Sequence, residues 1–268
     1  MEKKFKLGVI GAGYMATSII KGAIRSNFIN INDILVSDVL DSSLQRITDL
    51  GISVTKDNAL LANSCEYILF AVKPQNFNDL ALELKGTSCK KYISIMAGVK
   101  INRIKEKLGE VSVVRCMPNA PCQVGNGAVG IDLADFNDQV DKDFALNLFS
   151  GCAEVIEVEE NKLGAVTGIS GSAPAYFYLF AKGLIEAGVQ NGLTEEQAIK
   201  FVVNTMIGSG KMLFENKEKS IDELISSVCS KGGTTIEAIK VYTDRNLSEL
   251  SHQAVNACIK RSNELENI

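Results

Sequence analysis

The first 116 residues alternate short apolar runs with segments of helical periodicity. The apolar runs lack polar alternation, which is typical of strands buried on both faces of a parallel sheet. Between the runs, apolar residues recur at helical spacing, as at Ile19 and Ala23 or at Leu44 and Ile47. This alternation predicts an α/β fold with a doubly wound parallel sheet. The predicted strands span residues 5–10, 33–37, 67–72, 92–96 and 111–116.

Two further apolar segments follow these five runs. Residues 127–132 and 153–158 have strand character, and a helical pattern lies between them near residues 137–150. We expect this pair to add edge strands to the sheet and to complete a first domain at residue 161.

A glycine-rich turn joins the first predicted strand to the first predicted helix. It reads G-A-G-Y-M-A from Gly11 to Ala16, which matches the dinucleotide turn G-x-G-x-x-A. Gly11 permits a tight turn, Gly13 lets the backbone approach a pyrophosphate, and Ala16 allows close helix packing. Flavoproteins, methyltransferases and simple tight turns share the pattern. Its place between a strand and a helix favours a dinucleotide site.

Asp38 ends the second predicted strand. A carboxylate there would accept the adenosine ribose hydroxyls, which argues for NAD and against the 2′-phosphate of NADP. The alternative is that Asp38 caps the helix that follows. Arg46, one helix further on, could still reach a phosphate.

All four prolines lie in predicted loops, at Pro74, Pro118, Pro121 and Pro174. The first three follow buried strands, at the carboxyl edge of the sheet where ligands bind in this architecture. A fixed φ stiffens such loops, which suits a site for a nicotinamide ring.

From residue 162 the pattern is helical throughout. The segments T-E-E-Q (194–197), S-I-D-E (220–223) and T-T-I-E (234–237) each match a capping box, so Thr234 is predicted as a helix N-cap. Residues 176–185 are apolar nearly all round apart from Lys182. Such a helix needs burial on most sides, and we expect it to pack against another subunit.

The stretch S-K-G-G-T-T (230–235) interrupts this helical region. Its glycines would expose backbone N–H groups just before a helix, and Ser230 adds a hydroxyl. The arrangement predicts a small anion nest for a substrate carboxylate. The alternative is a capped turn without function.

Composition excludes several classes of protein. The net charge of −4 and the scattered basic residues argue against nucleic-acid and membrane partners. No apolar run is long enough for a membrane span, and the N-terminus leads directly into a predicted strand, so export is not expected. Seven cysteines without a C-x-x-C pair and a single histidine argue against a metal site and for reduced thiols in the cytoplasm. His252 is expected on a helix surface.

Six motifs in order along the chain resemble the pyrroline-5-carboxylate reductase family. They are I-G-A-G-Y-M-A, F-A-V-K-P-Q, S-I-M-A-G-V, R-C-M-P-N-A-P, V-T-G-I-S-G-S-A-P-A-Y and S-K-G-G-T-T. The resemblance implies an N-terminal Rossmann domain (1–161) and an all-helical C-terminal domain (162–268) for substrate binding and dimerisation. It also implies a homodimer, and some members form pentamers of dimers.

The resemblance further implies a reaction and its residues. NAD(P)H would transfer hydride to the imine carbon of a cyclic imino acid, giving L-proline, with NADH and NADPH left open. Thr235 would hydrogen-bond the ring nitrogen as the catalytic residue. Substrate contacts would fall on Ser230, Gly232, Gly233, Thr234 and Thr235. Cofactor contacts would fall on Ile10, Gly11, Ala12, Gly13, Tyr14, Met15, Asp38, Asn58, Ala71, Val72, Lys73, Pro74, Met96, Ala97 and Asn119.

Two residues depart from the family pattern. Lys231 occupies a usual proline position, which puts the stiffness of that loop in doubt, and Ala173 a usual glycine position. The rival assignments are a β-hydroxyacid dehydrogenase and a non-catalytic cofactor-binding sensor. The stretch from Gly168 to Tyr178 lacks the lysine that the first would use, and intact Gly233, Thr234 and Thr235 argue against the second.

Overall fold

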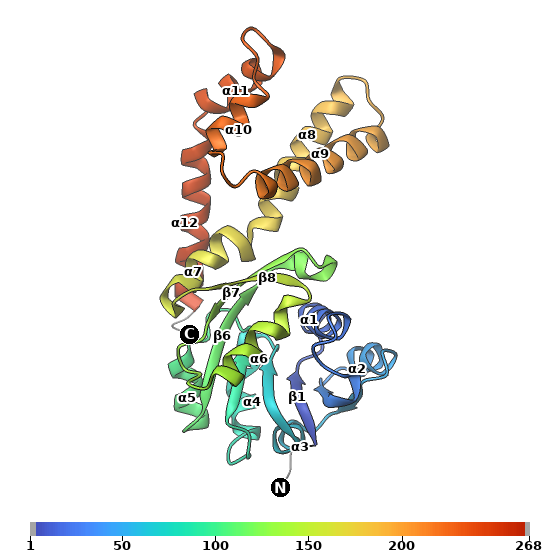
Figure 1. Cartoon of the computed structure of the whole chain (residues 1–268), viewed down its shortest axis with the longest axis vertical. Helices are drawn as coiled ribbons and strands as arrows, with labels where there is room; N and C mark the ends of the chain where they lie inside the picture. Colours follow the sequence, from blue (N-terminus) through green and yellow to red (C-terminus); the bar gives the residue numbers. More distant parts are fainter. Residues whose placement is uncertain (1–3, 266–268) are drawn as a thin grey trace. The chain divides into compact units, whose positions relative to one another are not determined.

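The computed structural model describes residues 4–265 and contains an eight-stranded sheet (Figure 1). The strand order is β3-β2-β1-β4-β5-β6-β7-β8. The strands are β1 (Phe5–Ile10), β2 (Ile34–Ser37), β3 (Ser53–Thr55), β4 (Cys65–Phe70), β5 (Lys91–Ser94), β6 (Ser112–Pro118), β7 (Gly127–Asp132) and β8 (Ala153–Glu157).

All neighbouring strands are parallel except β6 and β7, which are antiparallel. The five predicted strands and the doubly wound sheet are confirmed. The prediction that both 127–132 and 153–158 form edge strands is wrong for the first, because β7 lies between β6 and β8. The short connection 119–126 is too brief for a parallel crossover, so the chain turns back beside β6. Only β8 is an edge.

The second edge strand, β3, was not predicted. It contains only Ser53–Thr55 and none of its residues is fully buried. A short edge strand needs no continuous apolar run, so the sequence gives little signal for it.

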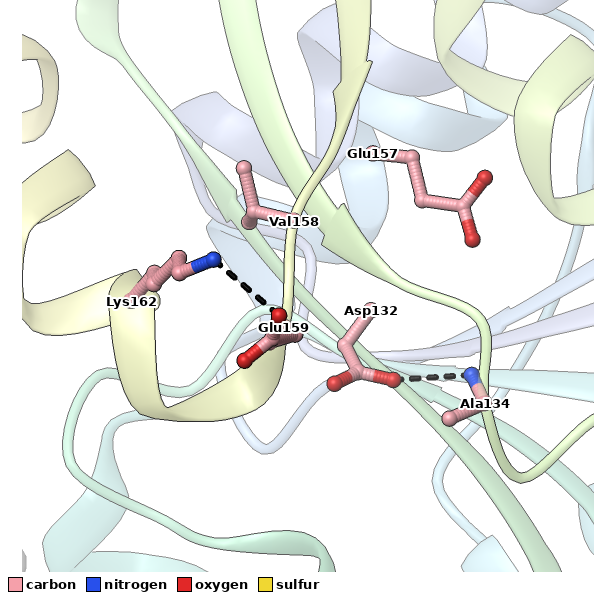
Figure 2. Close-up of a pocket in the computed structure, with 6 residues that line it drawn as sticks. All are labelled: Asp132, Ala134, Glu157, Val158, Glu159 and Lys162. Atoms are coloured by element: carbon pink, nitrogen blue, oxygen red, sulfur yellow. Dashed lines mark hydrogen bonds and ion pairs between the residues drawn. The ribbon is translucent and has the colours of Figure 1, made fainter.

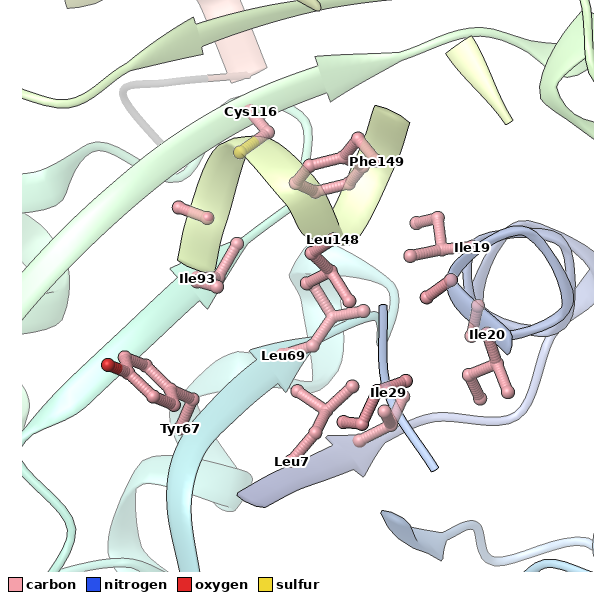
Figure 3. Packing of buried hydrophobic residues seen from close by; sticks show 14 of the residues in the cluster. Leu7, Ile19, Ile20, Ile29, Tyr67, Leu69, Ile93, Cys116, Leu148 and Phe149 are labelled. Atoms are coloured by element: carbon pink, nitrogen blue, oxygen red, sulfur yellow. The ribbon is translucent and has the colours of Figure 1, made fainter. Parts of the chain in front are cut away.

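Two hydrophobic clusters cover the two faces of the sheet. Along β4, Tyr67 and Leu69 belong to one cluster, and Ile68 and Phe70 belong to the other. This alternation follows from the two-residue period of a strand and leaves both faces buried. Figure 3 shows the first cluster, where Ile19 of α1 and Phe149 of α6 pack toward the strands. The covering helices are α1 (Tyr14–Arg25), α2 (Asp41–Thr48), α3 (Asn58–Ser64), α4 (Phe77–Glu83), α5 (Ile101–Leu108) and α6 (Gln139–Ser150).

The chain after β8 is helical in the described residues, as predicted. No helix within 4–265 is both long and apolar enough to span a bilayer. A π-helical turn, Thr167–Gly171, follows the short helix α7. The helices are α7 (Leu163–Val166), α8 (Ala173–Gln190), α9 (Glu195–Glu215), α10 (Ile221–Ser227), α11 (Thr234–Asp244) and α12 (Leu247–Leu265).

Two of the three predicted capping boxes are present. Thr194 caps α9 and Ser220 caps α10, each with the reciprocal bond from the third helical residue. The prediction for Thr234 is wrong by one residue. Gly233, with an extended backbone (φ −81°, ψ 171°), is the N-cap of α11, and no side chain caps this helix. Thr234 is already helical, and Glu237 pairs instead with Lys240 at 2.6 Å.

The chain divides into two compact units. The sheet unit runs to Pro174 and resumes at Ala257, and the helical unit covers Ala175–Asn256. Within the helical unit only Ala198 is buried. The apolar segment 176–185 is therefore not covered within its own unit. The domain boundary between residues 161 and 162 stays a prediction, and the outermost residues of both predicted domains, 1–3 and 266–268, lie outside the described chain.

Candidate active site

The carboxyl ends of β1, β2 and β4 meet at one edge of the sheet unit. The Gly11 N–H donates to the carbonyl of Ser37 at 2.8 Å, and the Ala71 N–H donates to the carbonyl of Ile10 at 2.9 Å. Gly11 has φ +100°, and a Cβ there would lie 2.7 Å from the Ala71 oxygen. Both the positive φ and the close approach exclude other residues. The turn after β1 is thus fixed against the chain that leaves β4.

The carboxylate of Asp38 is bound by two backbone N–H groups. One oxygen accepts from Ala12 at 2.7 Å and the other from Leu40 at 2.8 Å. The N-cap of α2 is Leu40 and makes no side-chain cap bond. The alternative prediction that Asp38 caps this helix is therefore wrong. Its side chain instead connects the end of β2 to the glycine-rich turn.

Arg46, on α2, lies beside the same turn. Its guanidinium donates to the Ala12 carbonyl at 3.3 Å, and it also reaches Ser43 Oγ at 3.0 Å and the Ser42 carbonyl at 3.1 Å. The guanidinium carbon lies 5.9 Å from the centre of the Tyr14 ring. These contacts turn Arg46 toward the protein backbone.

A pocket of about 520 Å³ opens at this edge of the sheet. Of the residues predicted for cofactor binding, it is lined by Ile10, Gly11, Gly13, Asp38, Asn58, Ala71, Val72 and Lys73. These positions are distributed over more than 60 residues of sequence, and the parallel topology brings them to one place. Concave sites of this size at the carboxyl ends of strands are typical of nucleotide pockets.

The other predicted cofactor residues lie outside this lining. Ala12 is buried within the turn and Tyr14 is exposed at the start of α1, while Met15 is half-buried. Pro74 begins the 3₁₀ turn after Lys73. Met96 is buried, and Ala97 and Asn119 are half-buried.

Several lining residues escaped the sequence prediction. They are Ser37, Val39, Leu40, Ser43, Lys56, Asn76, Asp79, Leu80 and Glu83. Asn76, Asp79, Leu80 and Glu83 repeat at helical spacing along the start and body of α4. That periodicity, following the A-V-K-P loop, was the signal that could have found them.

Asn58 links two walls of the pocket. It accepts from Ser37 Oγ at 2.6 Å and donates to Glu83 Oε2 at 2.7 Å. The amide therefore fixes the end of β2 against α4.

Asn119 anchors the loop after β6. Its Oδ1 accepts from the Ala128 N–H at 2.9 Å, and its Nδ2 donates to Ser170 Oγ at 3.0 Å. Ser170 belongs to the π-helical turn, a feature that often marks functional sites. Within this loop, a hydrogen bond with the Cys152 thiol holds the pKa of the Cys122 thiol below its ordinary value.

The predicted substrate residues form a tight turn in the helical unit. The Gly233 N–H donates to the Ser230 carbonyl at 3.0 Å, and Gly232 has φ +72°. A side chain at Gly233 would collide with Ser230 Oγ. Ser230, Thr234 and Thr235 are exposed, with Thr235 on the first turn of α11. The cofactor and substrate groups thus belong to different compact units.

A second pocket, of about 300 Å³, lies where β7 and β8 end (Figure 2). Its lining includes the carboxylates of Asp132, Glu157 and Glu159. Lys162 pairs with Glu159 at 3.0 Å, and Asp132 accepts from the Ala134 N–H at 2.8 Å. None of the predicted site residues lines it.

Comparison with known proteins gives matches at the level of families and of single relatives. The family model for pyrroline-5-carboxylate reductase dimerisation matches residues 160–265. A model for NADP oxidoreductase, coenzyme F420-dependent, matches residues 6–98. The pyrroline-5-carboxylate reductases of Staphylococcus aureus strain COL and Haemophilus influenzae are 36% and 32% identical to this chain, each match covering 98% of both proteins.

Solved structures give the same assignment. The pyrroline-5-carboxylate reductase of Coxiella burnetii superposes with a TM-score of 0.90 at 34% identity, over 98% of this chain and 99% of that one. The Plasmodium falciparum enzyme, solved with NADP bound, gives a TM-score of 0.87 at 28% identity, over 99% and 100%. The sequence motifs, the sheet with its pocket and the full-length relatives agree, and the chain belongs to the pyrroline-5-carboxylate reductase family.

Proposed function

We propose that this protein uses NAD(P)H to reduce the carbon–nitrogen double bond of 1-pyrroline-5-carboxylate, giving L-proline in the last step of proline biosynthesis. The observation that carries the proposal is the extent of the match, since relatives with this activity in their names align over 98% of the chain. The pocket beside the glycine-rich turn supports the cofactor half.

The pyrophosphate would lie at the turn from Gly11 to Gly13. A Cβ at Gly13 would meet no atom within 4 Å, so the protein itself does not require a glycine there. A requirement for a close approach by the cofactor explains it instead. The N-terminus of α1, with its outward N–H groups, would stabilise the phosphate charge.

The two ends of the cofactor would follow the walls of the pocket. Asp38 lies at the adenosine end, and its oxygens keep lone pairs for a ribose hydroxyl beyond the two N–H bonds they accept. The nicotinamide would lie toward Ala71–Pro74, Met96–Ala97 and Asn119. Asn119 is held from two sides and would give that end a fixed wall.

The turn of residues 230–235 would hold the imino acid. The N–H groups of Thr234 and Thr235 start α11 and carry no side-chain cap, so they can donate to a carboxylate, whereas the Gly233 N–H donates to the Ser230 carbonyl. Thr235 would hydrogen-bond the ring nitrogen, and Ser230, Gly232 and Thr234 would shape the turn.

Bound NAD(P)H supplies the hydride, which goes to the imine carbon. The imine nitrogen carries a proton in the iminium form, so one hydride completes the amine and no strong side-chain acid is needed. The chain's contribution is to bind and orient the two reactants.

Assembly and location complete the proposal. The match to the dimerisation model and the exposed apolar helices support a homodimer, and a pentamer of dimers is the larger assembly we expect. We propose a Rossmann domain of residues 1–161, a helical domain of residues 162–268 and a place in the cytoplasm.

An absorbance assay at 340 nm with 1-pyrroline-5-carboxylate and each nicotinamide cofactor tests the activity. Thr235→Ala should lower kcat/KM by a factor that corresponds to about 1 to 3 kcal/mol of transition-state stabilisation, the scale of one hydrogen bond in a desolvated site. Thr243→Ala is the matched control on α11, since Thr243 Oγ1 donates only to the Ile239 carbonyl. No turnover by the wild type with either cofactor refutes the function. Equal activity of wild type and Thr235→Ala refutes the role of Thr235.

A further inference from the structure

The glycine-rich turn is held by side chains that lie far from it in sequence. Ala12 donates its N–H to Asp38, 26 residues further on, and its carbonyl accepts from Arg46, 34 residues further on. These two polar groups belong to the consecutive peptide units before and after the Ala12 Cα. Gly13, whose surroundings are open, follows directly.

Both side chains are themselves fixed. The second oxygen of Asp38 is bound by the Leu40 N–H, and the Arg46 guanidinium is bound to its own helix through Ser42 and Ser43. A carboxylate on an N–H group and a guanidinium on a carbonyl are both charge-assisted hydrogen bonds. The segment from β2 to α2 therefore braces the turn after β1 from two sides.

We propose that Asp38 and Arg46 are positioning residues that hold the Ala12 backbone in the conformation that binds the pyrophosphate. This role deepens the proposed function and rests on its cofactor half. It differs from recognition of the adenosine ribose, because NADH and NADPH share the pyrophosphate and differ only at the ribose 2′ position.

The two roles predict different results. If Arg46 recognised a 2′-phosphate directly, its loss would weaken NADPH alone. If it braces the turn, its loss lowers the affinities for both cofactors by the same factor. Loss of Asp38 can change the ratio of the NADH and NADPH affinities through the ribose. If Asp38 also braces the turn, its loss lowers both affinities by a further, common factor.

The test measures the dissociation constants of NADH and NADPH by fluorescence titration without the imino acid, so it does not depend on the identity of the substrate. Arg46→Met keeps the aliphatic stem and removes the hydrogen-bond donors. It should raise the dissociation constants of NADH and NADPH about fivefold. Arg46→Lys, with charge but less reach, should recover part of that loss. Arg103→Met is the control, since Arg103 donates to Asn78 outside the pocket.

Asp38→Ser should raise the dissociation constants of both cofactors about tenfold. For Arg46→Met, kcat at saturating cofactor should stay near the wild-type value, because the proposed role concerns cofactor binding. The double variant should lose less than the product of the single losses, because both side chains hold the same residue. Thermal unfolding of each variant confirms that it is folded. A loss confined to NADPH in Arg46→Met, unchanged affinity for both cofactors, or losses that multiply in the double variant would overturn the proposal. If the cofactor titrations give the expected results but the assay with 1-pyrroline-5-carboxylate shows no turnover, the proposed substrate is refuted and the bracing role is not.

Discussion

In the sheet unit, Leu7, Leu69 and Phe149 are fully buried, whereas in the helical unit Phe177, Tyr178 and Leu179 are 61 to 72% exposed. Both units are rich in apolar side chains, so composition does not distinguish them. The sheet unit has two faces and enough helices to cover both. The helical unit has long helices without a layer to cover them.

The difference shows which unit buries its apolar side chains within one chain. Apolar area removed from water contributes about 25 cal/mol per Å², and the sheet unit gains this within one chain. The helical unit leaves large apolar patches exposed, which is typical of an interaction surface. Since the dimerisation model matches residues 160–265, a second copy of this chain is the cover that fits.

The largest expected effect comes from a charge on that uncovered surface. Leu179→Glu should dissociate the oligomer, because burying an unpaired carboxylate costs about 2 kcal/mol or more per copy. Leu82→Glu, on α4 of the sheet unit, is the matched control, since Leu179 is 72% and Leu82 73% exposed. Sedimentation velocity measures the mass of each. If the dimer persists in Leu179→Glu but dissociates in Leu82→Glu, the subunit interface lies on the sheet unit and not on the exposed helices.

A second test makes the same chemical change in both units. The Cβ of Gly151→Ala would collide with the backbone carbonyl of Gly22, where α6 meets α1, and should cost about 3 kcal/mol of unfolding free energy.

Gly183→Ala, inside α8, meets nothing within 4 Å and should gain up to about 1 kcal/mol through helix propensity. Urea unfolding measures both variants. If Gly183→Ala instead destabilises the oligomer, the second copy packs against that glycine. If Gly151→Ala costs nothing, the contact between α1 and α6 is looser than the structure has it.

The third prediction concerns an ion-pair network in the sheet unit. Asp141 accepts from Lys91 at 2.6 Å and from Tyr67 at 2.5 Å. Burial alone would raise the pKa of Asp141, but the bonds from Lys91 and Tyr67 outweigh it and hold the pKa below its usual value. The carboxylate therefore stabilises the fold above the ordinary aspartate pKa of about 4, and this contribution is lost as pH falls below it.

Asp141→Asn should lower the free energy of unfolding by about 2 kcal/mol at pH 7. The variant should then lose less stability than the wild type when the pH is lowered. Asp143→Asn is the control on the same helix, because Asp143 is exposed and its carboxylate accepts from Gln139. Urea unfolding at pH 7 and near pH 3 measures both. An Asp141→Asn protein as acid-sensitive as the wild type would refute the role.

Local sequence patterns predicted those parts of the molecule that depend on local physics. Continuous apolar runs gave the central strands, because strands buried on both faces have no polar alternation. The short edge strand Ser53–Thr55 has no such run and was missed. The turn from Gly11 to Gly13 was predicted from its place between a strand and a helix.

Contacts between distant residues were beyond such patterns. The bond from the Ala12 N–H to Asp38 spans 26 residues, and no local rule distinguishes a carboxylate that holds a turn from one that caps a helix. The motif T-T-I-E matches a capping box at Thr234 and so placed the cap of α11 one residue too late. The N-cap is the extended Gly233, which has no side chain for such a motif to detect.

The smallest expected effect tests caps within the helical unit, where the single chain buries few side chains and local bonds count for more. The Thr194 hydroxyl accepts from the Gln197 N–H at 3.2 Å as the N-cap of α9. Thr194→Ala should therefore cost about 1 kcal/mol and lower Tm. Thr234→Ala should change stability by less than about 0.5 kcal/mol, because Thr234 lies inside α11 and caps nothing. Equal losses in the two variants would show that Thr234 does cap α11 and that this helix begins one residue later than the structure has it.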